Sequence, residues 1–204
     1  MRRLARRLII AALLVVGVWQ VSAALYIHAK ARLAQVLIAD AWSKTLAGEQ
    51  RARPWPWADS WPIARLRMRK QNVDLYVLSD ATGRTLAFGP GLLSGSAAPG
   101  EMGNAVISAH RDTHFKFLRD ARAGAELELQ TANGHWHRYT LDERYVLDVR
   151  RDRLVVAADR STLTLMTCYP FDAIVPGGPL RFAVIAERVP ETARHRCSVS
   201  GHTC

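Results

Sequence analysis

The chain contains the stretch Leu163-Thr164-Leu165-Met166-Thr167-Cys168-Tyr169-Pro170, an apolar and β-branched run that ends in a cysteine. Such a run predicts a short buried strand. The strand must stop at Tyr169-Pro170, because proline cannot continue the hydrogen-bond ladder. A thiol at the end of a strand, beside a loop, is placed to meet a ligand, whereas a cysteine inside a core strand behaves as a small hydrophobe. Position alone leaves both interpretations of Cys168 open.

Other short β-like runs surround this one and are separated by turn signals. They predict a mainly β domain, a sandwich or a barrel, with short helices only at Phe115–Arg122 and Arg151–Ala157. Asn133-Gly134 is the strongest hairpin signal among the turns. The predicted strands are Val73–Leu78, Thr85–Phe88, Asn104–Ala109, Glu126–Thr131, Trp136–Tyr139, Tyr145–Asp148, Leu163–Thr167 and Leu180–Ala186.

A reactive cysteine needs a partner, because a thiol with an ordinary pKa of about 8.5 is mostly protonated at neutral pH. His110 ends the apolar run Ala105–Ala109, and small neighbours leave its ring room to face a cleft. The other histidines are weaker candidates. They lie in polar surroundings, in the segment after the N-terminal apolar stretch or near the C-terminus: His28, His114, His135, His137, His195 and His202. An end-of-strand histidine and an end-of-strand cysteine together favour nucleophilic catalysis.

Arg181 is the charged residue in the otherwise apolar run Leu180–Ala186. A buried and unpaired charge is costly, so its side chain should face solvent, a partner or a site. Acyl transfer needs positive charge or hydrogen-bond donors directed at the developing oxyanion. Arg181 is therefore a candidate oxyanion stabiliser, although an outward-facing strand arginine is the commoner case.

The N-terminus predicts a membrane anchor. Residues 1–7 are basic, and residues 8–27 carry no charge and are long enough, as a helix, to cross the hydrocarbon core. The preceding arginines predict that this end stays in the cytoplasm and that everything after residue 27 is exported. A cleavable signal peptide is the alternative, with Val21-Ser22-Ala23 as a possible cleavage site. The longer apolar run and its continuing helical pattern favour the uncleaved anchor.

The remaining segments divide the chain further. Residues 28–62 predict an amphipathic helix followed by a linker rich in proline and tryptophan, and residues 63–190 the folded domain. The linker tryptophans could lie at the membrane interface or pack on the domain. Residues 191–204 form a polar tail, where Cys197 and Cys204 are the likelier pair if a disulfide forms.

Composition narrows the possible functions. The 204 residues carry a formal net charge of +10, part of which comes from the N-terminal arginines. No zinc-finger spacing, basic recognition helix or RNA-binding aromatic signature accompanies that charge, so we expect no nucleic-acid partner. A basic domain beside an anionic membrane explains the charge. The tail histidines and cysteines match no trusted zinc pattern, so we expect no metal site.

Three segments in this order make the chain similar to the sortase family. The family's Thr-Leu-x-Thr-Cys motif corresponds to Thr164–Cys168, its histidine at the end of an apolar strand to Ala109-His110-Arg111, and its Arg-x-x-Val to Arg181–Val184. The resemblance covers about residues 72–188. One departure is Ser108, where many sortases have a small residue followed by glycine before the histidine. The anchor and short linker are most similar to the single-pass sortases of Gram-negative proteobacteria, whose domain faces the periplasm.

The resemblance implies a closed eight-stranded β-barrel and a cysteine transpeptidase. Cys168 would attack a threonine carbonyl in the C-terminal sorting signal, similar to Leu-Pro-x-Thr-Gly, of a secreted partner protein. His110 would be the acid and base, and Arg181 the oxyanion stabiliser. An amine acceptor would then take the acyl group, without metal or cofactor. Thr167 and Ile174 are the implied substrate-binding residues, with Phe171 and Val175 as further apolar candidates in the loop 169–179, although simple loop packing explains these apolar residues equally well.

Three alternatives fit the sequence less well. A peptidoglycan L,D-transpeptidase resembles a Ser-His-Gly-Cys signature, but Met166-Thr167 precede the cysteine here. A papain-like protease has its cysteine early and its histidine late, which is the reverse order. A non-catalytic anchored binding domain is disfavoured by the intact set of Cys168, His110 and Arg181.

Overall fold

The computed structural model of the chain describes residues 2–152, 159–175 and 177–190. Contacts divide the chain into two units, Met1–Leu37 and Ile38–Cys204. The predicted Arg151–Ala157 helix falls largely on residues 153–158, outside the described residues, as do Cys197 and Cys204.

The N-terminal segment is a single helix, α1 (Arg2–Leu46). No proline interrupts it, and the apolar run continues directly into the amphipathic one. The helix ends where Gly48 adopts a left-handed φ of 100°, while Glu49 N–H donates to Lys44 O at 3.0 Å and Gly48 N–H to Thr45 O at 3.0 Å. This is a Schellman ending, which satisfies the last carbonyls. Its part Ala12–Leu46 has the length and apolar composition to cross a membrane.

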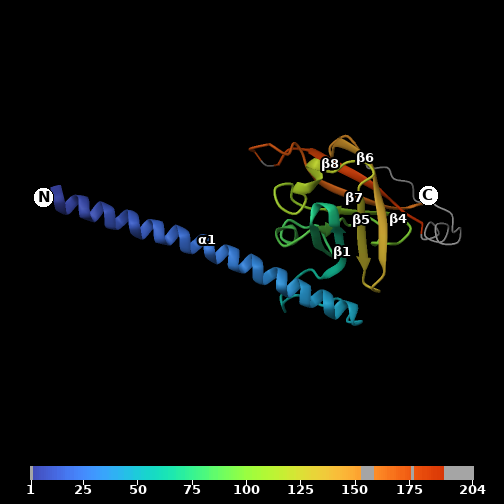
Figure 1. Cartoon of the computed structure of the whole chain (residues 1–204), viewed down its shortest axis with the longest axis horizontal. Helices are drawn as coiled ribbons and strands as arrows, with labels where there is room; N and C mark the ends of the chain where they lie inside the picture. Colours follow the sequence, from blue (N-terminus) through green and yellow to red (C-terminus); the bar gives the residue numbers. More distant parts are fainter. Residues whose placement is uncertain (1, 153–158, 176, 191–204) are drawn as a thin grey trace, which may run out of the picture. The chain divides into compact units, whose positions relative to one another are not determined.

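Eight strands of the second unit close into a barrel, which confirms the predicted fold class (Figure 1). Around the barrel the order is β1-β2-β3-β4-β7-β8-β6-β5. The strands are β1 (Pro62–Met68), β2 (Val73–Leu78), β3 (Gly91–Leu92), β4 (Gly103–Ser108), β5 (Glu126–Thr131), β6 (Trp136–Asp148), β7 (Ser161–Cys168) and β8 (Leu180–Arg188).

Eight strands were predicted and eight exist, but they are different sets. β2 and β5 have the predicted bounds, and β5 pairs with β6 across the predicted Asn133-Gly134 turn, where Gly134 has a φ of 85°. β1 and the two-residue β3 were not predicted from the sequence. The buried positions of β1 alternate with arginines, because Leu66 and its in-facing neighbours fill the barrel while Arg65 and Arg67 face outward.

Three predicted strands are wrong in kind or extent. Thr85–Phe88 is not a strand but holds the 3₁₀ helix η2 (Thr85–Ala87). Asp80 causes this, because its carboxylate accepts hydrogen bonds from the Thr85 hydroxyl at 2.7 Å and the Thr82 backbone N–H at 3.1 Å. Such local bonds compete with the sheet ladder.

The other correction is a fusion. The predicted strands Trp136–Tyr139 and Tyr145–Asp148 are the two ends of the single strand β6, whose pairing with β8 shifts register between Leu141 and Arg144. A bulge of this kind bends a strand without ending it. The predicted short helix Phe115–Arg122 is present as the 3₁₀ helix η3 (Lys116–Asp120).

The barrel interior is a continuous apolar core to which most strands contribute. It is built by in-facing side chains at alternate positions, each removed from water, and this burial stabilises the barrel. Its largest fully buried members include Leu66, Ile107, Leu129, Tyr139, Leu141 and Leu163.

One tryptophan of the linker, Trp55, packs on the folded domain. Trp55 meets Phe88 edge-on at 5.1 Å between ring centroids. The Trp61 ring lies 5.3 Å from the Arg51 guanidinium, a contact within the linker itself. Trp57 differs, since 79% of it is exposed. Of the two interpretations of the linker tryptophans, packing on the domain therefore holds for Trp55.

Candidate active site

The parallel pairing of β4 and β7 leads His110 to the side of Cys168. Pairing runs from Gly103 opposite Ser161 to Ser108 opposite Met166. It continues one residue further, because Ala109 N–H donates to Met166 O at 3.2 Å and the Thr167 hydroxyl to Ala109 O at 2.7 Å. The residues that follow Ala109 and Thr167 are His110 and Cys168.

The antiparallel pairing of β7 and β8 places Arg181 on the other side. Cys168 and Arg181 are register partners at the last pair of this ladder. Directly opposite residues of an antiparallel pair have Cβ atoms about 4.5–5.5 Å apart. The three predicted catalytic residues thus belong to the same end of three adjacent strands.

Exposure at this end suits a site open to a ligand. Cys168 is partly exposed and is the free cysteine of the described part of the chain. His110 is exposed. As a residue, Cys168 is therefore not fully enclosed in the hydrocarbon core, as a purely structural cysteine would be.

The guanidinium of Arg181 is held by its own loop. Its Nη1 donates to Gly178 O at 2.7 Å and to Leu180 O at 2.9 Å. A guanidinium has five N–H donors in a fixed fork, so Nε and Nη2 can still turn toward an acceptor. The backbone bonds orient the fork before any substrate arrives.

The backbone on either side of His110 is fixed as well. The His110 carbonyl accepts a hydrogen bond from Phe115 N–H at 3.0 Å, and Phe115 is fully buried in the core. Ala109, on the other side, is bound to β7 through the two bonds given above. The imidazole therefore projects from a segment with little freedom.

Thr167, a predicted substrate-binding residue, lies inside the barrel wall. Its side chain is 1% exposed and its hydroxyl is already bound to Ala109 O. In this structure it ties β7 to the segment carrying His110. Its contact with substrate remains a prediction. The geometry supports an indirect role, in which Thr167 fixes the position of the segment that carries His110.

The loop after Cys168 has an anchored part and an exposed part. Phe171 packs edge-on against Phe182 at 5.3 Å, and Tyr169 stacks on Phe182 at 6.2 Å. Ile174 and Val175, in contrast, are 96% and 78% exposed. Loop packing thus accounts for Phe171, while Ile174 and Val175 remain available to a ligand.

Arg111 is buried beside the candidate site, which its sequence position did not predict. It follows His110, yet it is only 8% exposed, and it donates from Nη1 to Pro170 O and from Nη2 to Ala173 O, both at 2.6 Å. The available signal was its place directly after the candidate histidine.

His114 and His137 are also less exposed than the sequence suggested. Burial, with the nearby His110 ring, lowers the pKa of His114 below its ordinary value of about 6.5. His137 Nδ1 lies 2.7 Å from Arg188 Nη2. Within residues 2–152, 159–175 and 177–190, no group of three or more histidine, cysteine or acidic side chains is arranged to hold a metal ion.

An open pocket of about 510 Å³ lies beside the segment that carries His114. Residues at the start of β2 line one part of this pocket, and residues of the segment after His110 line the other. Its lining is mixed in polarity, and Asp74, one of its two carboxylates, is already bound by arginines. The lining residues are Asn72, Val73, Asp74, Leu75, Thr113, His114, Lys116, Phe117 and Asp120.

Comparison with known proteins gives one consistent result. A family model described as the Sortase domain matches residues 66–189. Sortase D of Bacillus subtilis (strain 168) is 29% identical over 125 residues, which are 61% of this chain and 62% of that protein. The chain thus spans less than two thirds of this relative.

Solved structures agree on the fold. Sortase A from Corynebacterium diphtheriae has a TM-score of 0.58 and 26% identity, covering 66% of this chain and 63% of that one. A Clostridium perfringens structure described as a Sortase D5 transpeptidase has a TM-score of 0.57 and 24% identity, covering 74% and 89%. At this identity the second likeness speaks for the barrel alone.

Proposed function

Because the chain belongs to the sortase family, as the match over residues 66–189 shows, we propose that it is a membrane-anchored cysteine transpeptidase. Its substrate is a secreted protein with a C-terminal sorting signal similar to Leu-Pro-x-Thr-Gly. The observation that carries the proposal is the strand register, which leads His110, Cys168 and Arg181 to one end of β4, β7 and β8.

In the first step, the Cys168 thiol gives its proton to His110, and its sulfur attacks the threonine carbonyl carbon of the sorting signal. The carbonyl oxygen becomes an oxyanion, and Arg181 offers its Nε and Nη2 donors while Nη1 stays bound to the loop. The C–N bond then breaks, and the imidazolium of His110 protonates the leaving amine. The product is a thioacyl enzyme.

In the second step, an amine acceptor attacks the thioester carbonyl. Neutral His110 takes the proton from the incoming nitrogen, and the C–S bond breaks to release the Cys168 sulfur. Water in place of the amine gives hydrolysis. Both steps need only side chains of this chain, which suits the proposal that no cofactor takes part.

The exposed loop residues are the candidate substrate contacts. Ile174 and Val175 lie in the loop that begins directly after Cys168, and both present apolar surface to solvent. Burying such surface against a ligand is favourable at about 25 cal/mol per Å². An apolar residue of the sorting signal is the partner that fits them.

The helix α1 supports the anchoring part of the proposal. Ala12–Leu46 is long and apolar enough to span a bilayer, and arginines precede it. The positive-inside rule then places the N-terminus in the cytoplasm and the barrel outside, in the periplasm if the membrane is an inner membrane. Cysteine accessibility at the two ends of α1 in intact cells tests this orientation.

The catalytic proposal is tested by trapping the thioacyl enzyme. The full chain is incubated with a peptide that carries Leu-Pro-x-Thr-Gly, and the adduct is located by mass spectrometry. We expect acylation at Cys168, none in Cys168→Ala, and unchanged acylation in the Cys197→Ser/Cys204→Ser variant. An adduct on either tail cysteine would refute the assignment of the nucleophile.

A further inference from the structure

Arg111 is a buried cation that is held mainly by backbone carbonyls. Its two short hydrogen bonds, at 2.6 Å, end on Pro170 O and Ala173 O. Its nearest acidic group, Asp112 Oδ1, lies 3.4 Å from Nε on a side chain that is 72% exposed. Buried charges are costly unless they are well paired, so a buried arginine in this position needs a reason.

The acceptors show what this cation joins. Pro170 and Ala173 bracket a turn, since Ala173 N–H also donates to Pro170 O at 3.3 Å. That turn begins two residues after Cys168, and Arg111 is the residue directly after His110. The guanidinium therefore joins the segment that carries the imidazole to the loop that follows the thiol, although the two lie far apart in sequence.

A planar fork suits this task better than a point charge. Two N–H groups of one rigid guanidinium bind two carbonyls of one turn, which fixes both the distance and the orientation of the segments. On the other side of Cys168, the Thr167–Ala109 bond performs the same kind of joining. Cys168 thus lies between two cross-links to the chain around His110.

We infer that Arg111 is a positioning residue, whose buried guanidinium holds the loop after Cys168 against the segment after His110 and so sets the thiol–imidazole geometry. The inference rests on the proposed function, in which Cys168 and His110 act together. Arg111 itself touches no reacting atom. Misplacing a catalytic group by about 1 Å can cost about 10²-fold in rate.

The test measures the alkylation rate of Cys168 by iodoacetamide against pH, from about pH 5 to pH 10, because the thiolate is the reactive form. The full chain in detergent carries Cys197→Ser and Cys204→Ser, so a single thiol reports. Arg111→Met removes the fork but keeps the apolar stem, and Arg111→Lys keeps one donor group. Arg119→Met, at an exposed arginine of η3, is the matched control. His110→Ala gives the profile of a thiol without its imidazole.

We expect Arg111→Met to move the pH profile toward that of His110→Ala and to lower alkylation at neutral pH about tenfold, with a loss in kcat of about 10–10². Arg111→Lys should fall between, and Arg119→Met should match the parent. A folded Arg111→Met with the parent profile overturns the inference. If Arg111→Met does not fold, a pH profile in Arg111→Lys equal to that of the parent also overturns the inference.

The two proposals fail in different ways. If His110→Ala itself keeps the parent profile, the His110–Cys168 pair is wrong. A changed profile in Arg111→Met would then still show that Arg111 positions Cys168. If His110→Ala changes the profile and Arg111→Met does not, the catalytic pair stands and the positioning role is wrong.

Discussion

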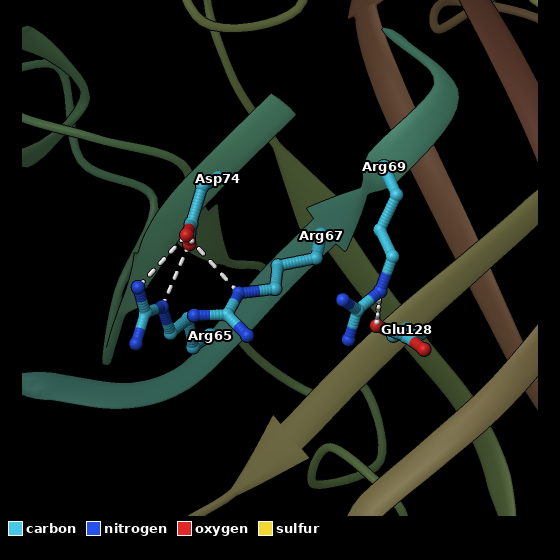
Figure 2. A network of polar contacts seen from close by, with 5 residues as sticks. All are labelled: Arg65, Arg67, Arg69, Asp74 and Glu128. Atoms are coloured by element: carbon cyan, nitrogen blue, oxygen red, sulfur yellow. Dashed lines mark hydrogen bonds and ion pairs between the residues drawn. The ribbon is translucent and has the colours of Figure 1, made fainter. Parts of the chain in front are cut away.

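The protein uses arginine in two contrasting ways, on the outer face of β1, β2 and β5 and at the end of β4 and β7. On the outer face, Asp74 accepts hydrogen bonds from Arg65 and Arg67, and Arg69 reaches Glu128 (Figure 2). At the strand ends, Arg111 is buried and binds two backbone carbonyls.

The two arrangements differ in what their partners are joined to. Arg65 and Asp74 are near neighbours on the paired strands β1 and β2, and their bonds repeat a connection that the backbone ladder already makes. Asp74 is 45% and Arg69 71% exposed, so water and salt compete for them. Arg111 joins two loops that no ladder connects. The importance of an arginine therefore depends on the segments it links and its burial, and less on the number of its bonds.

The largest effect should follow from His110→Ala. Removing the proposed acid and base should lower transpeptidation of a sorting-signal peptide by about 10²–10⁴-fold. His135→Ala, at an exposed histidine beside the β5–β6 turn, is the control and should keep the parent rate. Steady-state kinetics measures the rate, and circular dichroism checks that the variants are folded to the same extent. A full rate in His110→Ala would show that His110 is not the acid and base at the strand ends.

Thr167→Val should have the next largest effect. It keeps the β-branched shape but takes the hydroxyl donor from Ala109 O at a buried site. Removing one partner of a buried hydrogen bond costs about 1–3 kcal/mol. Urea unfolding should show this loss, and turnover should fall with it. Thr140→Val, at a partly exposed threonine of β6, is the control, and equal losses in both variants would contradict the special position of Thr167.

Asp74→Asn should have a smaller effect that depends on pH. Burial tends to raise the pKa of Asp74, but hydrogen bonds from Arg65 and the charges of Arg65 and Arg67 outweigh it and lower the pKa below its ordinary value. A lowered native pKa gives stability that is present above the unfolded pKa of about 3.9 and is lost as pH falls through the native value.

We therefore expect parent and Asp74→Asn to differ by at most about 1 kcal/mol at neutral pH, as for other exposed pairs, and to converge below about pH 4. Urea unfolding at a series of pH values measures the difference. A gap that widens as the pH falls would contradict the sign of the lowered pKa.

The smallest effect is expected for Arg69→Gln. The ion pair with Glu128 has an N–O distance of 2.9 Å, but the arginine is mostly exposed. Exposed pairs contribute about 0–1 kcal/mol, so the free energy of unfolding should change by less than about 0.5 kcal/mol, and less still at high salt. A loss as large as that of Thr167→Val would show that the outer face and the strand ends do not differ as proposed.

Local sequence predicted the elements whose signals are local. Asn133-Gly134 marks its hairpin, because Gly134 N–H closes the turn on Thr131 O at 2.8 Å and Gly134 itself has the positive φ that glycine adopts without strain. Pro170 marks the end of the strand that carries Cys168. The same approach failed where local and tertiary signals compete. β1 was missed because Arg65 and Arg67 interrupt its apolar pattern, and Thr85–Phe88 was misassigned because Asp80 binds the hydroxyl of Thr85.

In the candidate site too, some features were predictable from local sequence and others depended on tertiary contacts. The types and order of His110, Cys168 and Arg181 were sufficient to suggest a thiol acyl-transfer site, and their roles remain predictions for kinetics to test. For Arg111, the sequence offered only its place directly after the candidate histidine, which does not indicate burial. Whether an arginine after a histidine is buried depends on the loop that covers it, which is contributed by residues some 60 positions later.

From the sequence alone followed a mainly β domain, an apolar N-terminal helix and a cysteine at the end of a strand, since each depends on residues within a few positions of one another. Tertiary structure decided that β4 lies parallel to β7 and β7 antiparallel to β8, and hence which side chains share one end. It also decided that Arg111 is enclosed while Arg69 is not. Register and burial depend on contacts between distant segments, and these form only when the barrel closes.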